Sequence, residues 1–238
     1  MRYLMIVTYN GLNFNGFQTQ KNGNTIQNHL NNALKTILKQ EVLTVGSGRT
    51  DAKVSAYNQP VHFETDVSIN PQKFIRSING LLPNEIKVLS VKQTELHARF
   101  SAKQKTYVYK MYLDNIDQPL KQNRLRINEN INLKNMKKFV KLLVGEHDFK
   151  GFQASGSPTE TTIRKIYKAK LITHKNNLTF KITGNGFLYK MVRNIVGTML
   201  SIGEGKINLK QLKPTLFTTF KATATAKPEF LYLFNVKY

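Results

Sequence analysis

The stretch GSGRTDAKVSA (Gly46–Ala56) follows the apolar run EVLTV (Glu41–Val45). The run predicts a short strand, and the glycines after it predict a tight turn. The chain has only 14 Asp+Glu against 36 Lys+Arg, yet this turn carries Asp51 between Arg49 and Lys53. Nearby cations favour the ionised form of a carboxylate. Asp51 could therefore serve as a nucleophile beside RNA-binding cations, and it could equally be a turn residue that bonds its own backbone.

The 238 residues are 40% hydrophobic and carry a formal net charge of +22 at pH 7. Such an excess opposes a compact fold through self-repulsion unless a polyanion neutralises it. RNA, DNA or an anionic membrane would do so, and a solvated basic surface without a partner is the remaining alternative. The chain has no cysteine, which excludes disulfides, cysteine-based zinc sites and thiol nucleophiles.

Several enzyme classes are excluded because their motifs are missing. The sequence has no P-loop, no H-E-x-x-H and no G-x-S-x-G, and its five histidines are scattered, so we expect no metal site. No apolar run approaches the roughly 18 residues of a membrane helix, and the N-terminus lacks a signal-peptide cleavage site. We therefore expect a soluble cytoplasmic protein whose chemistry uses Asp, Arg, Tyr or Lys side chains and no cofactor.

The hydrophobic periodicity predicts alternating strands and helices over the first hundred residues, an α+β or α/β pattern. A second unit of strands and helices follows, with the boundary near Ser101–Gln104. Asn24 or Thr25 and Asn70 are expected to cap helices, and residues 146–162 are expected to form a polar loop. The predicted strands are 2–9, 59–65, 86–92, 105–113, 163–173, 177–185 and 228–238, and the predicted helices are 24–40, 70–82, 132–145 and 187–205.

Arg193 lies within the apolar helix pattern MVRNIVG. A buried arginine without a partner costs several kcal/mol, so a partner is expected, unless the side chain reaches solvent from the helix edge.

The block GRTDAKVSA resembles the GRTD signature of the tRNA pseudouridine synthase A family. Five further segments resemble that family in the same order along nearly the whole chain, which makes the resemblance far more specific than one motif. These segments are YNGLNFNGFQTQ (9–20), TIQNHLNNAL (25–34), HARFSAKQKTYVY (97–109), MVRNIVGTML (191–200) and ATAKPEFLYL (224–233).

The resemblance implies isomerisation of uridine to pseudouridine at positions 38, 39 and 40 of tRNA, without metal or organic cofactor. It implies two ferredoxin-like or RRM-like α+β domains, 1–103 and 104–238, with joined antiparallel sheets, a central active-site cleft and a homodimer. Asp51 would be the nucleophile, Arg193 its partner, and Arg49 the residue that replaces the displaced base. Tyr107 would stack on the target base. Further substrate contacts are expected from Gln18, Lys53 and Arg99.

The sequence departs from the family pattern at four positions. Lys53 and Ser55 stand where glycine and histidine are usual, and Asn10 and Phe17 where aspartate and tryptophan are usual. These differences bear on rate and substrate range more than on reaction type. The alternatives are a non-catalytic RNA-binding or chaperone protein on the same fold, and a pseudouridine synthase that acts on another RNA.

Overall fold

The computed structural model describes residues 1–21, 23–156 and 159–238, which form two compact units. The first unit comprises Met1–Lys103 with Tyr232–Tyr238, and the second comprises Gln104–Leu231. Both mix helices with strands, and most of their strand pairs are antiparallel. The predicted α+β class is confirmed at this level. Two ferredoxin-like or RRM-like domains at 1–103 and 104–238, with joined sheets and a cleft, stay predictions.

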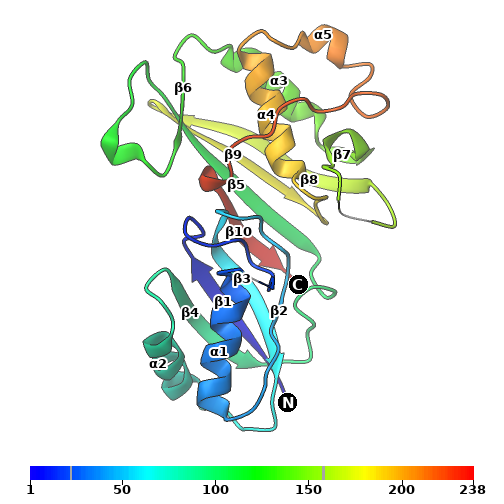
Figure 1. The fold of residues 1–238 in the computed structure, drawn as a ribbon. Coiled ribbons are helices and arrows are strands. Elements are labelled where there is room, and N and C mark those ends of the chain that lie inside the picture. The colour runs from blue at the N-terminus through cyan, green and yellow to red at the C-terminus, as the bar shows by residue number, and fades with distance from the viewer. Residues whose placement is uncertain (22, 157–158) are drawn as a thin grey trace. The chain divides into compact units, whose positions relative to one another are not determined.

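The sheet of the first unit has the strand order β4-β1-β3-β10 (Figure 1). β1 (Arg2–Tyr9) is antiparallel to both β3 (Ser55–Glu64) and β4 (Ile86–Gln93). β10 (Leu231–Lys237) pairs in parallel with β3 through Tyr232 and Leu233, although it comes from the far end of the chain. The predicted strands at 2–9 and 86–92 are therefore confirmed, while β3 begins earlier than predicted.

Two helices cover one face of this sheet. α1 (Ile26–Leu38) is capped by Thr25, and α2 (Pro71–Leu81) is capped by Asn70, whose side chain accepts from the Lys73 N–H at 3.1 Å. Phe63 of β3 stacks on Phe74 of α2 with ring centroids 5.8 Å apart. Side chains alternate along a strand, so His62 lies on the opposite face of the sheet from Phe63.

The strand prediction for Glu41–Val45 is wrong, because β2 spans only Val45–Gly46. Thr44 instead donates its backbone N–H and its hydroxyl to Asn31 Oδ1, at 3.0 and 2.8 Å, and its carbonyl accepts from Gln27. Both partners belong to α1. Helix side chains thus satisfy the backbone groups that a neighbouring strand would otherwise pair.

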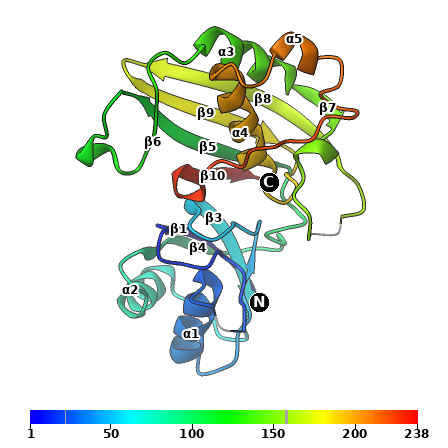
Figure 2. The same ribbon diagram turned by 45° about the horizontal axis from the view of Figure 1, so that its top comes forward.

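The sheet of the second unit has the order β5-β9-β8-β7, with β6 parallel to β5 (Figure 2). The predicted strands at 163–173 and 177–185 are confirmed; they pair as an antiparallel hairpin whose turn contains Lys175 at a φ of 50°. α3 packs against α4 and against β8, so both helices lie over one face of the sheet. The strands are β5 (Gln104–Leu113), β6 (Leu125–Ile127), β7 (Gly145–Asp148), β8 (Ile163–His174) and β9 (Asn177–Gly184), and the helices are α3 (Leu133–Leu142), α4 (Met191–Gly203) and α5 (Leu209–Leu212).

The apolar pattern at 187–205 gives α4, which is buried over most of its length and begins only at Met191. The loop prediction for 146–162 is partly wrong, because β7 and a 3-10 turn at Lys150–Phe152 occupy its start. Positions 157 and 158 of that loop lie outside the described residues. Phe149 and Phe152 are fully buried, which explains why this polar-looking segment is ordered against the core. No helix of the described ranges is long and apolar enough to cross a membrane.

Candidate active site

The turn that carries Asp51 connects β2 to β3 in the first unit and is anchored at its start by Gln59. Ser47 Oγ donates to Gln59 Oε1 at 3.1 Å, and Gln59 Nε2 donates to the Gly48 carbonyl at 2.6 Å. Gln59 is fully buried, so it replaces the water that would otherwise solvate these backbone and hydroxyl groups. The chain is therefore fixed on the N-terminal side of Asp51.

The segment between β1 and α1 anchors the same turn on its other side. The Phe17 N–H donates to the Thr50 carbonyl at 3.1 Å, and the Lys53 N–H donates to the Phe14 carbonyl at 3.1 Å. The hydroxyls of Tyr9 and Thr50 lie 2.8 Å apart and are buried. Backbone bonds on both sides of position 51 therefore hold the aspartate on a rigid frame.

Two glycines allow the backbone of the segment between β1 and α1 to lie against the backbone of the Asp51 turn. A Cβ on Gly11 would lie 2.0 Å from the Val54 carbonyl oxygen. Gly16 has a φ of +98°, and its Cβ would lie 2.8 Å from the Thr50 carbonyl oxygen. Any larger residue would push this segment away from the turn.

Asp51 is partly exposed, and its carbonyl accepts from the Val54 N–H at 3.1 Å. Lys53 is the third residue of this turn and has a φ of 67°. A turn with positive φ only at its third residue has the type II pattern, in which glycine is preferred there. This geometry explains why Lys53 in place of glycine matters: the turn keeps its conformation, and a residue with a side chain adopts the left-handed region.

The other departures from the family pattern have local explanations. Ser55 is buried, and its Oγ accepts from the Gly11 N–H at 2.9 Å, so a short hydroxyl ties the two segments together. Phe17 is buried against Gly46, whose Cβ would lie 2.6 Å from the Phe17 ring. Asn10 is exposed and accepts from the Leu12 N–H.

The remaining predicted residues of the first unit have different surroundings. Arg49 is exposed on the turn beside Asp51. Gln18 donates from Nε2 to the Oε1 of Gln27 on α1 at 2.8 Å. This contact ties the segment between β1 and α1 to the helix. Arg99 is exposed near the end of the unit, with its guanidinium carbon 5.6 Å from the centre of the Phe100 ring.

Tyr107 and Arg193 belong to the second unit. Tyr107 lies on β5 opposite Ile182 of β9, is 9% exposed, and meets Phe187 edge-to-face at 5.2 Å. Arg193 is in the first turn of α4 and is partly buried. Its Nε donates to the Ala226 carbonyl at 2.8 Å, and its own carbonyl accepts from the Ala226 N–H at 3.1 Å. This reciprocal pair fixes the arginine backbone and the inner part of its side chain.

Three residues of this region escaped the sequence interpretation. Asn194 is buried and bonds both the Phe152 carbonyl and the Thr225 hydroxyl, which holds the start of α4. Tyr109 is fully buried, donates to the Lys227 carbonyl at 3.0 Å, and has its pKa raised because burial disfavours the phenolate. A polar asparagine inside an apolar helix was the available signal for Asn194. Phe187 had no comparable signal.

Known proteins are similar to this chain over its full length. A protein named tRNA pseudouridine synthase A from Thermoanaerobacter sp. (strain X514) is 39% identical, with 100% of each chain covered. Proteins of the same name from Ruminiclostridium cellulolyticum and Bacillus subtilis are each 37% identical, with 98% of both chains covered in the first case, and 100% of this chain and 99% of the relative in the second. The chain belongs to the tRNA pseudouridine synthase A family.

The family model described as tRNA pseudouridine synthase matches residues 139–238. This range contains α4 with Arg193 and the strand β10. The Asp51 turn and Tyr107 lie before it, within the full-length matches to members of the tRNA pseudouridine synthase A family. The resemblance found from separate motifs thus agrees with similarity over the whole chain.

Proposed function

We propose that this chain isomerises uridine to pseudouridine at positions 38, 39 and 40 in the anticodon stem-loop of tRNA, with Asp51 as the nucleophile. The main support is the partly exposed Asp51 on a turn anchored on both sides, in a member of the tRNA pseudouridine synthase A family. A positioned carboxylate can form a covalent bond to carbon without a metal or organic cofactor. A frame of this rigidity limits its motion during attack.

Asp51 attacks C1′ of the ribose or C6 of the uracil. In either route the bond between C1′ and N1 breaks, the uracil turns, and a bond forms between C1′ and C5. The bond between Asp51 and carbon breaks, C5 loses its hydrogen as a proton, and N1 takes up a proton. Product and substrate are therefore isomers, and no oxidant or reductant is consumed. Water has to be excluded while the base is detached, because hydrolysis would compete.

The other proposed site residues assist at defined points. Arg193 pairs with Asp51 and positions its carboxylate. Arg49 takes the place of the base that leaves the stem-loop, where unstacking costs a few kcal/mol. Tyr107 stacks on the target uracil, and its edge-to-face contact with Phe187 fixes the ring plane for that purpose.

Gln18, Lys53 and Arg99 are proposed as RNA contacts. The net charge of +22 supports an extended phosphate-binding surface. We further propose that the protein works in the cytoplasm as a homodimer, so that one tRNA touches both subunits, and that the active site lies in a cleft between two ferredoxin-like domains.

The test is release of tritium from unmodified tRNA labelled at uridine C5, because only bond formation at C5 expels that hydrogen. The wild-type protein should release it, and Asp51→Ala and Asp51→Asn should bind the tRNA without release. Asp66→Ala removes another exposed carboxylate of the first unit and should keep activity. Release by Asp51→Ala would refute the nucleophile. Binding without release by the wild type would favour a non-catalytic RNA-binding protein.

A further inference from the structure

A cavity of about 520 Å³ lies within the second unit. One wall is the segment from Tyr112 to Arg126, which leaves β5 and returns as β6. The other wall includes Lys227 and Phe230, in the segment that leads to β10. None of the residues proposed above for the reaction lines this cavity.

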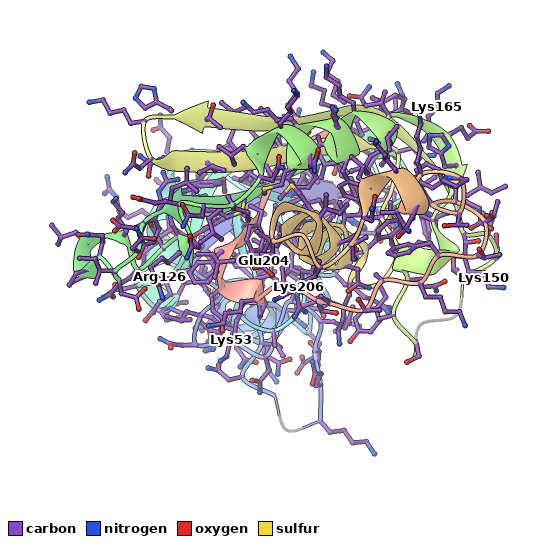
Figure 3. The ribbon with its side chains drawn as sticks, turned by 90° about the horizontal axis from the view of Figure 1, so that it is seen from above. Lys53, Arg126, Lys150, Lys165, Glu204 and Lys206 are labelled. Carbon is purple, nitrogen blue, oxygen red and sulfur yellow. The ribbon has the colours of Figure 1, made fainter. Side chains whose placement is uncertain are left out.

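The lining of the cavity is strongly basic. It contains four cationic side chains, Lys121, Arg124, Arg126 and Lys227, and a single carboxylate, Asp117. Asp117 accepts from Arg126 Nε at 2.7 Å, so that carboxylate and one of the cations neutralise each other (Figure 3 labels Arg126). Lys121, Arg124 and Lys227 remain as three positive charges for which the lining offers no second carboxylate.

Arg124 stands out among these three. Its Nη1 is buried and has no hydrogen-bond partner among the described residues. Leaving a buried donor unsatisfied costs roughly as much as its desolvation, and the cost is larger for a charged group. Stability alone would not favour this arrangement, because an apolar side chain of similar size would fill the same space without the cost.

Bonds at both ends hold the walls in place. The Tyr112 hydroxyl accepts from the Gln118 N–H at 3.1 Å, and Lys121 Nζ lies 4.7 Å from the centre of the Tyr112 ring. On the opposite wall the Lys227 carbonyl accepts from the Tyr109 hydroxyl at 3.0 Å. The cationic groups are thus presented by a fixed backbone on each side, which lowers the entropic cost of binding an anion between them.

We propose that this cavity binds a phosphate group, with Arg124 as the principal donor and Lys121 and Lys227 as flanking cations. The planar guanidinium matches the oxygens of a phosphate and forms strong charge-assisted hydrogen bonds with it. Phe230, which is partly exposed, adds aromatic surface beside these cations, which suits a nucleotide better than a bare ion. The phosphate comes from the RNA backbone or from a free phosphate-bearing molecule, and only the first source rests on the proposed function.

The variant Arg124→Met separates this role from a structural one. Its unfolding midpoint in urea should equal or exceed that of the wild type, because the unsatisfied donor is removed. Its affinity for a fluorescent anticodon stem-loop RNA should fall about tenfold or more, as expected for one lost charge-assisted bond. The salt dependence of binding should become shallower by about 0.7 to 0.9 in log–log slope. Lys137→Met, an exposed cation on α3, removes the same charge and should change neither the affinity nor the slope by that much.

A second arm identifies the source of the phosphate. Inorganic phosphate and uridine monophosphate, at constant ionic strength, are tested for stabilisation of wild type and Arg124→Met against heat. A loss confined to RNA binding assigns the site to the RNA backbone, and a loss confined to the small anions assigns it to a free phosphate. If Arg124→Met loses neither, the proposal is overturned. Tritium release by the wild type is scored separately, so that failure of this site and failure of the proposed reaction remain distinct.

Discussion

His62 should make the first unit sensitive to acid. The residue is 5% exposed, and its Nδ1 accepts from the Ala98 N–H at 3.1 Å, so the folded protein needs that nitrogen unprotonated. Burial, followed by the His97 ring at 4.5 Å and by Arg2, lowers the pKa of His62 from 6.5 to about 4, and Glu64 opposes this only weakly. The unfolded chain, in contrast, takes up the proton at the ordinary pKa.

The sign and size of this pH dependence follow from the linkage between proton binding and folding. Between the two pKa values the unfolded state binds more protons than the folded state, so stability is present above the unfolded pKa and is lost as pH falls. A depression from 6.5 to about 4 corresponds to about 3 kcal/mol in total. About 2 kcal/mol of this should disappear between about pH 7 and about pH 5, because most of the unfolded-state titration occurs in that interval.

The assay compares urea unfolding of wild type and His62→Asn across this interval. Far-UV circular dichroism is suitable, because the chain has no tryptophan. Asparagine keeps an oxygen near the position of Nδ1 to accept from Ala98 but does not titrate, so it subtracts the general effect of rising positive charge. The wild type should lose about 2 kcal/mol more than the variant. Equal losses in the two proteins, or a His62 resonance that titrates near its ordinary pKa by NMR, would refute the reasoning.

Two further substitutions test the backbone geometry through urea midpoints. Lys53→Gly should stabilise the folded protein by about 1 kcal/mol, because glycine has no steric penalty at a φ of 67°. The control Lys92→Gly in β4 should destabilise it by about 0.5–1 kcal/mol. A loss of stability at both positions would contradict the turn geometry. Gly197→Ala should destabilise the folded protein by about 1–3 kcal/mol, because the new Cβ would lie 2.2 Å from the Ala224 carbonyl oxygen. The control Gly80→Ala in α2 places its Cβ within 4 Å of nothing and should stabilise the protein by up to about 1 kcal/mol. A gain of stability in both variants would refute close packing at α4.

Helices and strands whose sequences carry a clear local signal were predicted correctly. α2 has Asn70 as its cap and Pro71 at its first position, and both features are visible in the sequence. The strand at Glu41–Val45 was mispredicted because a short run of apolar and β-branched residues is typical of a strand. Its backbone partners are side chains of α1, which no local pattern reveals. The pairing of β10 with β3 joins segments far apart in the chain and is equally invisible to local rules.

For the candidate site, sequence could single out Asp51 and its neighbours but not the frame that holds them. The resemblance marked Lys53 and Ser55 as unusual. Only the structure shows that Lys53 adopts a positive φ and that Ser55 accepts from the Gly11 N–H. The cavity around Arg124 had no sequence signal, because its cations come from two segments about a hundred residues apart.

Arg124 and Lys53 are each unfavourable for the free protein, Arg124 through a buried unpaired donor and Lys53 through a positive φ. They differ in whether a bound ligand can remove the free-energy cost. Such departures are expected where function requires them. A phosphate would satisfy the unpaired donor of Arg124, so bound RNA should stabilise the wild type more than Arg124→Met by mass action. No ligand can relieve the backbone φ of Lys53, so its steric penalty persists in any complex. The penalty at Lys53 is therefore offset only by interactions of its side chain that glycine would lack.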